Sequence, residues 1–191
     1  NQMRATRRDA YWHVDISVFF TMDDQRSLIY ALIDNYSRKI LSWRCDKGTA
    51  SKKIVGEMIK EALAARNPQN LVLVTDGGPE NINGYIKKLI YEYSAKGKNI
   101  RHEVAMTTIR KSNSMIERFF RLMKYDYLFR AKPDNHEELQ VILERMFHEY
   151  NFVRPHYSLD HRTPDEAYRG VPPMNFRKQL LEGRRLRFEK N

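Results

Sequence analysis

The sequence lacks the features that mark disulfide-rich, membrane-spanning and secreted proteins. Cysteine occurs once, at Cys45, which excludes an internal disulfide and a CxxC-type zinc site and suits a reducing compartment. No stretch approaches the roughly 20 apolar residues of a membrane span, and Arg4, Arg7 and Arg8 are not followed by the hydrophobic run of a signal peptide. We therefore expect a soluble, cytoplasmic protein with no membrane partner.

Internal repeats and low-complexity segments are also absent, so one compact domain is the simplest organisation for 191 residues of which 41% are hydrophobic. We expect an N-terminal arm over residues 1–10, a core domain over residues 11–170 and a basic tail over residues 171–191. The first residue is Asn1, which suggests a segment of a longer protein. A net charge of +10 makes nucleic acid the first partner to consider, although a basic protein without such a partner is equally compatible with charge alone.

Alternating residues predict strands in the first quarter of the sequence. In the segment from Tyr11 to Thr21, apolar side chains alternate with His13, Asp15 and Ser17, which places Asp15 in the middle of a strand. Ser27–Asp34 and Lys39–Arg44 then form a hairpin. Three antiparallel strands follow from these patterns.

The remaining patterns predict a mixed sheet with crossover helices. A helix capped by Ser51 ends at Asn67, and the apolar run Leu71–Val74 is typical of a buried inner strand that stops just before Asp76. Further elements are expected as a helix over 82–95, a strand over 100–106, and helices over 114–130 and 136–151. This order indicates an α/β domain with three layers and a five-stranded mixed sheet.

Three carboxylates are placed where chemistry is expected. Asp15 is costly to desolvate in a strand unless a cation or hydrogen-bond donors compensate its charge. Asp76 follows a strand at the end where open α/β sheets present ligand-binding groups. Glu117 lies one turn into its helix, and at about 100° per residue it shares a face with Arg121 and Lys124.

If these acids converge, divalent cations must occupy the space between them. Oxygen ligands without a cysteine or histidine cluster favour Mg²⁺, with Mn²⁺ as a substitute. Two such ions could support in-line attack on a phosphodiester. Cations nearby would then position the DNA backbone; besides Arg121 and Lys124, the preceding loop offers Arg110, Lys111 and Asn113.

Four segments resemble one known family. HVDIS (13–17), VTDGGPE (74–80), SNSMIERFFRLMK (112–124) and NFVRPHYSLDHRTPDEAY (151–168) are similar to the catalytic domain of DDE-type integrases and transposases, meaning bacterial insertion-sequence transposases and retroviral-type integrases. The last segment is the most distinctive, and the resemblance covers about residues 11–170.

The resemblance implies a ribonuclease H-like fold with Asp15, Asp76 and Glu117 as catalytic metal ligands. It also implies contacts of Arg121 and Lys124 with DNA ends, 3′-end cleavage and strand transfer of mobile-element DNA, a homodimer or larger homo-oligomer, and a bacterial, nucleoid-associated location. We assign the Arg154-Pro155-His156 segment mainly to fixing the chain after the last helix.

Two other functions are compatible with the same residues. A ribonuclease H-like nuclease would use the same metals but would only hydrolyse its substrate. A DNA-binding or assembly module whose chemistry has decayed would keep the basic surface without metal-dependent activity.

Overall fold

The computed structural model describes residues 4–76, 84–105 and 114–173. Within them, strands and helices follow one another along the chain as β1 (Tyr11–Phe20), β2 (Arg26–Asp34), β3 (Ile40–Lys47), α1 (Lys52–Arg66), β4 (Asn70–Thr75), α2 (Gly84–Ser94), β5 (Asn99–Val104), α3 (Ser114–Leu122), η1 (Met123–Leu128), α4 (Phe129–Ala131), α5 (His136–Phe152), η2 (Tyr157–Leu159) and α6 (Pro164–Arg169). None of the helices in these ranges combines the length and apolar character needed to cross a membrane.

The five strands form one mixed sheet in the order β3-β2-β1-β4-β5. The first three are joined by short turns and pair antiparallel. β4 pairs parallel with β1, and β5 pairs parallel with β4. A helix precedes each of these two strands and returns the chain to the end of the sheet where β1 begins, so that the strands run in the same direction. The mixed five-stranded sheet predicted from the sequence is therefore confirmed.

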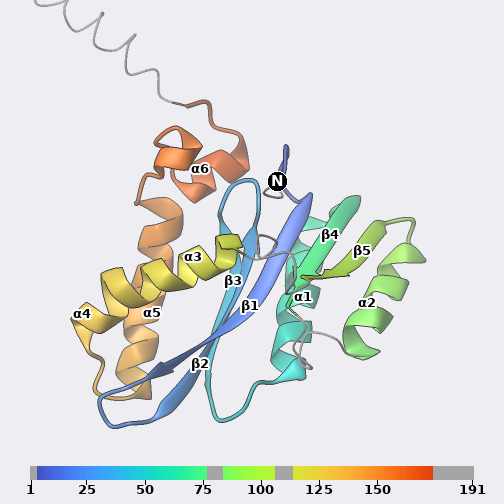
Figure 1. The fold of residues 1–191 in the computed structure, drawn as a ribbon. Helices are drawn as coiled ribbons and strands as arrows, with labels where there is room; N and C mark the ends of the chain where they lie inside the picture. Colours follow the sequence, from blue (N-terminus) through green and yellow to red (C-terminus); the bar gives the residue numbers. More distant parts are fainter. Residues whose placement is uncertain (1–3, 77–83, 106–113, 174–191) are drawn as a thin grey trace, which may run out of the picture.

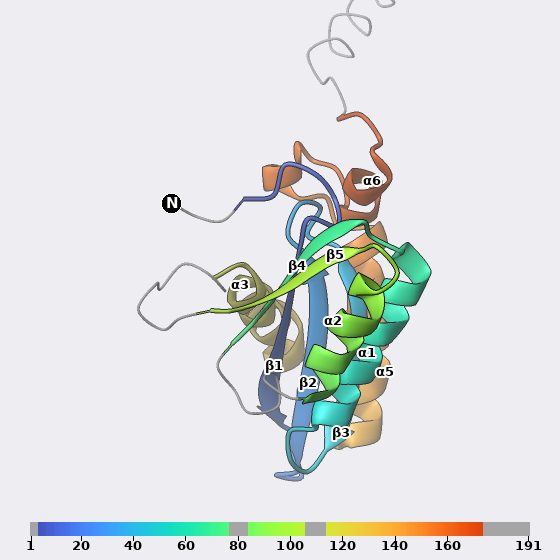
Figure 2. The ribbon, with the colours of Figure 1, turned by 90° about the vertical axis from the view of Figure 1, so that its right-hand side faces the viewer.

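Helices cover both faces of this sheet and create two separate cores (Figure 1). α1 and α2 pack on one face, and α3, η1 and α5 pack on the other. Figure 2 shows α3 on one side of the strands and α1 and α2 on the opposite side. The alternation in β1 produces this division, since Trp12 and Val14 enter the first core and Phe19 enters the second.

The predicted ends of α1 are confirmed by its caps. The Ser51 side chain accepts a hydrogen bond from the backbone N–H of Ile54 at 3.4 Å. Asn67 ends the helix in the left-handed conformation, with φ at 46°, and its N–H donates to the carbonyl of Leu63. Both observations follow from side chains that favour helix ends.

The prediction of one continuous α-helix over residues 114–130 is wrong for the middle of that segment. Residues Met123–Leu128 form a π-helical turn, in which the N–H of Phe129 donates to the carbonyl of Lys124. The core explains the change. Met123 and Leu128 are both fully buried, whereas a regular α-helix would place residues five apart about 140° from each other. The wider turn brings both side chains onto the sheet-facing side.

The other element ends differ from the expected ones by a few residues. β3 runs over Ile40–Lys47 instead of beginning at Lys39, because Arg38 has a φ of 65° and Lys39 still belongs to the turn. β5 ends at Val104. The helix expected over 82–95 is α2, and its expected start lies outside the described residues.

Candidate active site

Asp15 and Asp76 lie at the same level on two neighbouring parallel strands. The register of β1 and β4 runs up to the pair Val14 and Thr75. Asp15 and Asp76 each come one residue later along the chain, and adjacent strands are about 4.8 Å apart. Residues that are paired across a sheet also point to the same face. Continuing this register by one residue puts Asp15 and Asp76 at the same level and on the same face, at the carboxyl end of β4.

That face is the one covered by α3. Asp15 of β1 pairs with Ala31 of β2, and Ala31 is buried in the core beneath α3 and α5. Asp15 and Asp76 are both half-buried. The Asp15 carboxylate accepts a hydrogen bond from the backbone N–H of Ile16 at 2.8 Å. The two aspartates are consequently neither fully buried nor fully exposed on the face that α3 covers.

Glu117 lies on the exposed side of the first turn of α3, which packs against β1 (Figure 1). Its neighbours Ile116, Phe119 and Phe120 face the core, which is the helical pattern expected from the sequence. Within residues 4–76, 84–105 and 114–173, no three His, Cys, Asp or Glu side chains lie close enough to hold a metal ion together. The structure thus brings two of the predicted acids together and places the third on the helix above the same face.

The donors present on this face fit a hard cation. Asp15 and Asp76 offer carboxylate oxygens, the ligands that magnesium prefers. His13 is also in β1, but it is buried and its Nε2 is 3.0 Å from the Asn35 side-chain nitrogen. His102 is 2.9 Å from the Thr75 hydroxyl, and burial lowers its pKa. Within the described ranges no cluster of three His, Cys, Asp or Glu side chains forms, so the donor set does not resemble a zinc site.

The predicted DNA-binding residues fall into two groups. Arg121 is exposed on α3, and Lys124 is half-buried in the π-helical turn, where desolvation lowers its pKa. Arg110, Lys111 and Asn113 lie outside the described residues. The structure therefore describes only the helical part of the expected DNA surface.

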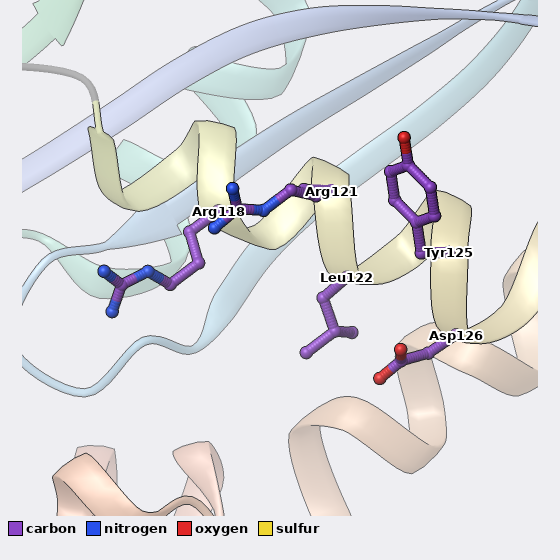
Figure 3. A pocket seen from close by; sticks show the side chains of 5 residues that line it. All are labelled: Arg118, Arg121, Leu122, Tyr125 and Asp126. Carbon is purple, nitrogen blue, oxygen red and sulfur yellow. The ribbon is translucent and has the colours of Figure 1, made fainter.

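Beside Arg121, the structure reveals a groove that the sequence did not identify. It has a volume of about 400 Å³ and is lined by Arg118, Arg121, Leu122, Tyr125 and Asp126 (Figure 3). These residues recur at i, i+3, i+4, i+7 and i+8, a helical spacing that could have revealed them. The stripe of Glu117, Arg121 and Lys124 lies on the adjacent side of the helix, and Arg121 belongs to both stripes.

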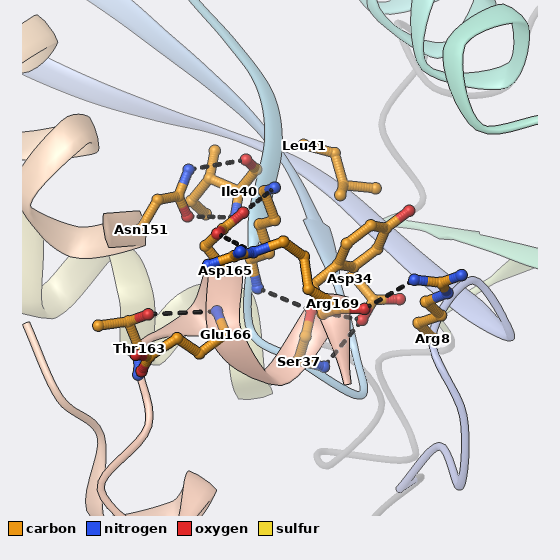
Figure 4. A network of polar contacts seen from close by, with 12 residues as sticks. Arg8, Asp34, Ser37, Ile40, Leu41, Asn151, Thr163, Asp165, Glu166 and Arg169 are labelled. Atoms are coloured by element: carbon orange, nitrogen blue, oxygen red, sulfur yellow. Dashed lines mark hydrogen bonds and ion pairs between the residues drawn. The ribbon is translucent and has the colours of Figure 1, made fainter. Parts of the chain in front are cut away.

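The segment that carries the most distinctive motif holds the fold together through a set of contacts that we call the C-terminal clasp, made by Asn151, Thr163, Asp165, Glu166 and Tyr168. Asn151 forms two hydrogen bonds with the backbone of Ile40, accepting at 2.9 Å and donating at 3.0 Å. The carboxylate of Asp165 lies 2.6 Å from both Lys39 and Arg169 (Figure 4). The clasp therefore fastens α5 and α6 to the beginning of β3.

Two further contacts complete the clasp. Thr163 and Glu166 form a capping box at the start of α6, with each side chain accepting from the other's backbone N–H. The Tyr168 hydroxyl donates to Asp9 at 2.8 Å, and Arg8 donates to the carbonyl of Tyr168. The last helix is thus tied to the segment that precedes β1.

The Arg154-Pro155-His156 segment makes structural contacts, as the sequence predicts. Arg154 pairs with Asp126 at 2.9 Å. The His156 ring meets the edge of Tyr150 at 4.7 Å between centroids, and its Nε2 has no hydrogen-bond partner. Burial lowers the pKa of His156 to about 4, with nearby Arg154 adding to the effect, so the ring is neutral at pH 7.

The turn between β2 and β3 links the clasp to α3. Asp34 is fully buried and accepts hydrogen bonds from the N–H groups of Ser37 and Asp9, both at 2.8 Å. From this fixed turn, the Arg38 side chain contacts the sulfur of Met115. Met115 comes two residues before Glu117 in the first turn of α3. The clasp therefore supports, through one hairpin turn, the helix end that presents Glu117.

Comparisons with protein families match most of the chain. Two family models, both described as Integrase core domain, match residues 5–111 and 98–164. The first covers more than half of the 191 residues. A protein of Spiroplasma virus SpV1-C74, named as a candidate integrase (ORF3), is 30% identical over 152 residues. The match covers 74% of this chain but 41% of the viral protein, so the chain spans less than half of that relative.

Solved structures reveal the same fold. A chain of the simian T-cell lymphotropic virus intasome, solved with the PP2A regulatory subunit B56 gamma, matches with a TM-score of 0.69 at 17% identity, covering 91% of this chain and 60% of that one. The HTLV-2 integrase catalytic core domain in complex with magnesium matches in its dimeric and trimeric forms, with TM-scores of 0.63 and 0.65. Both HTLV-2 matches are 15% identical and cover 86% of this chain and 99% of theirs. The expected ribonuclease H-like fold is confirmed.

Proposed function

Because the chain belongs to the integrase core domain family, we propose that it is a magnesium-dependent polynucleotidyl transferase that cleaves the 3′ ends of mobile-element DNA and joins them to a target. The observation that carries this proposal is the shared level of Asp15 and Asp76 on neighbouring strands. Two carboxylates at one level of a sheet offer the oxygen ligands that a divalent cation prefers.

We assign the metal ligands as Asp15, Asp76 and Glu117. Mg²⁺ bound there would offset charge on the attacked phosphate and favour formation of the attacking oxyanion. Asp15 belongs to β1 and Asp76 follows β4, whereas Glu117 would approach the site from the first turn of α3. The turn of α3 that carries Glu117 has its own support, because the Arg38 side chain contacts Met115 in that turn.

The two reactions share one bond exchange. In cleavage, water attacks the phosphorus and the O3′ of the neighbouring nucleotide leaves. In strand transfer, the free 3′-hydroxyl attacks a target phosphodiester, so that one P–O bond forms as another breaks. Arg121 and Lys124 would hold the DNA backbone during both steps, because they occupy the same helix as Glu117.

DNA and a second copy of the chain are the proposed partners. A formal charge of +10 favours a polyanion, and joining two element ends requires at least two active sites. The relatives support an assembly, because the HTLV-2 core domain was solved in dimeric and trimeric forms. Light scattering with and without DNA would measure the oligomeric state of this chain.

The decisive experiment measures joining of duplex oligonucleotides with free 3′-hydroxyl ends to a supercoiled plasmid in Mg²⁺. Asp76→Asn and Glu117→Gln should each lower product formation by about 100-fold or more, since even indirect supports of a metal site are worth 10- to 100-fold. DNA binding should persist in both variants. Glu92→Gln, which changes an exposed glutamate on α2, is the matched control and should join ends normally.

The outcomes separate the alternatives. Shortened strands without joined products would identify a nuclease that only hydrolyses. Wild type and Glu117→Gln that behave identically across a Mg²⁺ titration would indicate a DNA-binding module without metal chemistry. Anomalous scattering from Mn²⁺ soaked into crystals tests the ligands directly, and manganese bound away from Asp15 and Asp76 would refute their assignment.

A further inference from the structure

The groove beside α3 combines positive charge with an exposed aromatic ring. Arg118 and Arg121 are exposed, and neither forms an ion pair with an acidic side chain within the described ranges. The acid that lines the groove, Asp126, is already paired with Arg154 at 2.9 Å. The two guanidinium groups are consequently available to an anion. Figure 3 shows them extending from α3, while Tyr125 and Asp126 come from the following turn.

Tyr125 forms a supported platform in this groove. Its side chain is prominently exposed, at 63%, yet it meets Phe129 edge-on at 5.2 Å and 79° between rings. Phe129 in turn contacts Phe19 of β1 at 5.9 Å. A chain of ring contacts therefore connects the exposed tyrosine to the core. An aromatic ring that is exposed but held in place loses little side-chain entropy when a flat ligand stacks on it.

The chemistry of these residues selects a nucleotide. Arginines bind phosphates through paired N–H groups, and an aromatic ring stacks on any nucleobase. Leu122 adds apolar surface to the same groove. A volume of about 400 Å³ falls within the usual range of roughly 300–1,000 Å³ for small-molecule sites. A base within a duplex keeps its faces covered by its neighbours, so stacking requires a base that is unpaired.

We propose that this groove binds one unpaired nucleotide of a DNA strand, with the base against Tyr125 and Leu122 and the flanking phosphates at Arg118 and Arg121. The site shares Arg121 with the face that carries Glu117 and Lys124, and its other residues lie on the adjacent side of the helix. This inference rests on the proposed function only because it takes DNA as the ligand. It adds that the protein binds frayed or single-stranded DNA ends more tightly than blunt duplex ends. The π-helical turn supplies Tyr125 and Asp126, and such turns are frequent at functional sites.

The test compares binding of the full chain to a fluorescent blunt duplex and to the same duplex with unpaired 5′ nucleotides, in EDTA so that no reaction occurs. Tyr125→Ala should lower affinity for the overhang DNA by about tenfold and leave blunt-duplex affinity unchanged, because base stacking is lost. Tyr125→Phe should behave as wild type, since it keeps the ring. Tyr91→Ala, at a tyrosine 74% exposed on α2, is the matched control and should change nothing.

A second variant addresses the phosphates. Arg118→Ala should weaken binding of the overhang DNA and reduce the slope of log affinity against log salt by about one phosphate contact. A 2-aminopurine placed in the overhang should be quenched by wild type and Tyr125→Phe but not by Tyr125→Ala. Thermal unfolding of each variant checks that the fold is intact.

Three results would overturn the proposal. These are equal loss of blunt and overhang binding in Tyr125→Ala, wild-type overhang affinity in that variant, or competition by polyglutamate as effective as by a single-stranded oligonucleotide. The last would identify an acidic protein segment as the occupant. Because binding is measured without metal, failure of the joining reaction would refute the proposed activity without affecting this result.

Discussion

The two faces of the sheet differ in what covers them. The α1–α2 core takes its buried side chains from β1, β2, β4 and β5, with partly buried Leu41 of β3 packed against it, and is largely aliphatic. Among the described residues, the α3–α5 core draws on β1, β2 and β3 only and is rich in phenylalanine. Asp15 and Asp76 lie beside the margin of this second core, where β1 meets β4. One face is therefore devoted to stability, whereas the other combines packing with the candidate chemistry.

This comparison predicts different consequences for core mutations on the two faces. Phe119→Ala should have the largest effect, because Phe119 contacts Phe120, Phe147 and Tyr150 at ring distances of 4.9–5.7 Å. We expect a loss of about 3–5 kcal/mol in the free energy of unfolding. Joining activity per folded molecule should also fall, since α3 presents Glu117. Urea denaturation and the joining assay measure the two effects, and normal activity in the folded fraction would contradict the second.

On the opposite face, Met58→Ala should affect stability alone. Met58 is fully buried between α1 and the sheet, so its truncation should cost about 2–5 kcal/mol. Activity per folded molecule should match wild type, because α1 does not contribute to the candidate site. Reduced activity at temperatures where the variant is fully folded would show that the faces are coupled.

The clasp offers a smaller effect that sharpens the comparison. Asn151→Ala removes two hydrogen bonds and leaves the backbone groups of Ile40 unpaired in a buried position. We expect a loss of about 1–3 kcal/mol in the free energy of unfolding. Asn99→Ala is the control, because its exposed hydrogen bond with Asn70 should contribute less than about 0.5 kcal/mol. Equal losses in the two variants would refute a special role for the clasp.

The smallest effect concerns pH. Burial lowers the pKa of His156 to about 4 in the fold, whereas the unfolded chain binds this proton near pH 6.5. Between these values the unfolded state holds more protons, so stability falls as the pH decreases from about 6.5 to 4. His156→Phe should remove part of that fall, on the order of 1 kcal/mol, after allowance for the partial exposure of the site. Urea denaturation at pH 7 and pH 4.5 measures the difference, and identical pH profiles would contradict it.

The sequence predicted local features well because their causes are local. The alternation around Asp15 determined which side chains enter each core, and the caps of α1 were visible in Ser51 and Asn67. The positions of strands and of most helices followed from the same periodicities. These elements depend on residues that are close together in the sequence.

The features that were missed depend on distant partners. The π-helical turn arises because Met123 and Leu128 must both enter a core built by other elements. Asn151 and Ile40 are separated by 111 residues, so no local sequence pattern predicts their hydrogen bonds. The position of Glu117 relative to the aspartates likewise depends on tertiary packing, and the segments next to Asp76 and to α3 lie outside the described residues.

The π-helical turn also has an evolutionary consequence. A turn closed by i→i+5 hydrogen bonds accommodates one residue more than an α-helical turn, and it lies after Glu117 and Arg121 but before the end of the helix. Insertions or deletions of single residues could be absorbed there without displacing the acid at the amino end. Such a position allows the downstream surface to diversify between related elements while the reaction centre keeps its geometry.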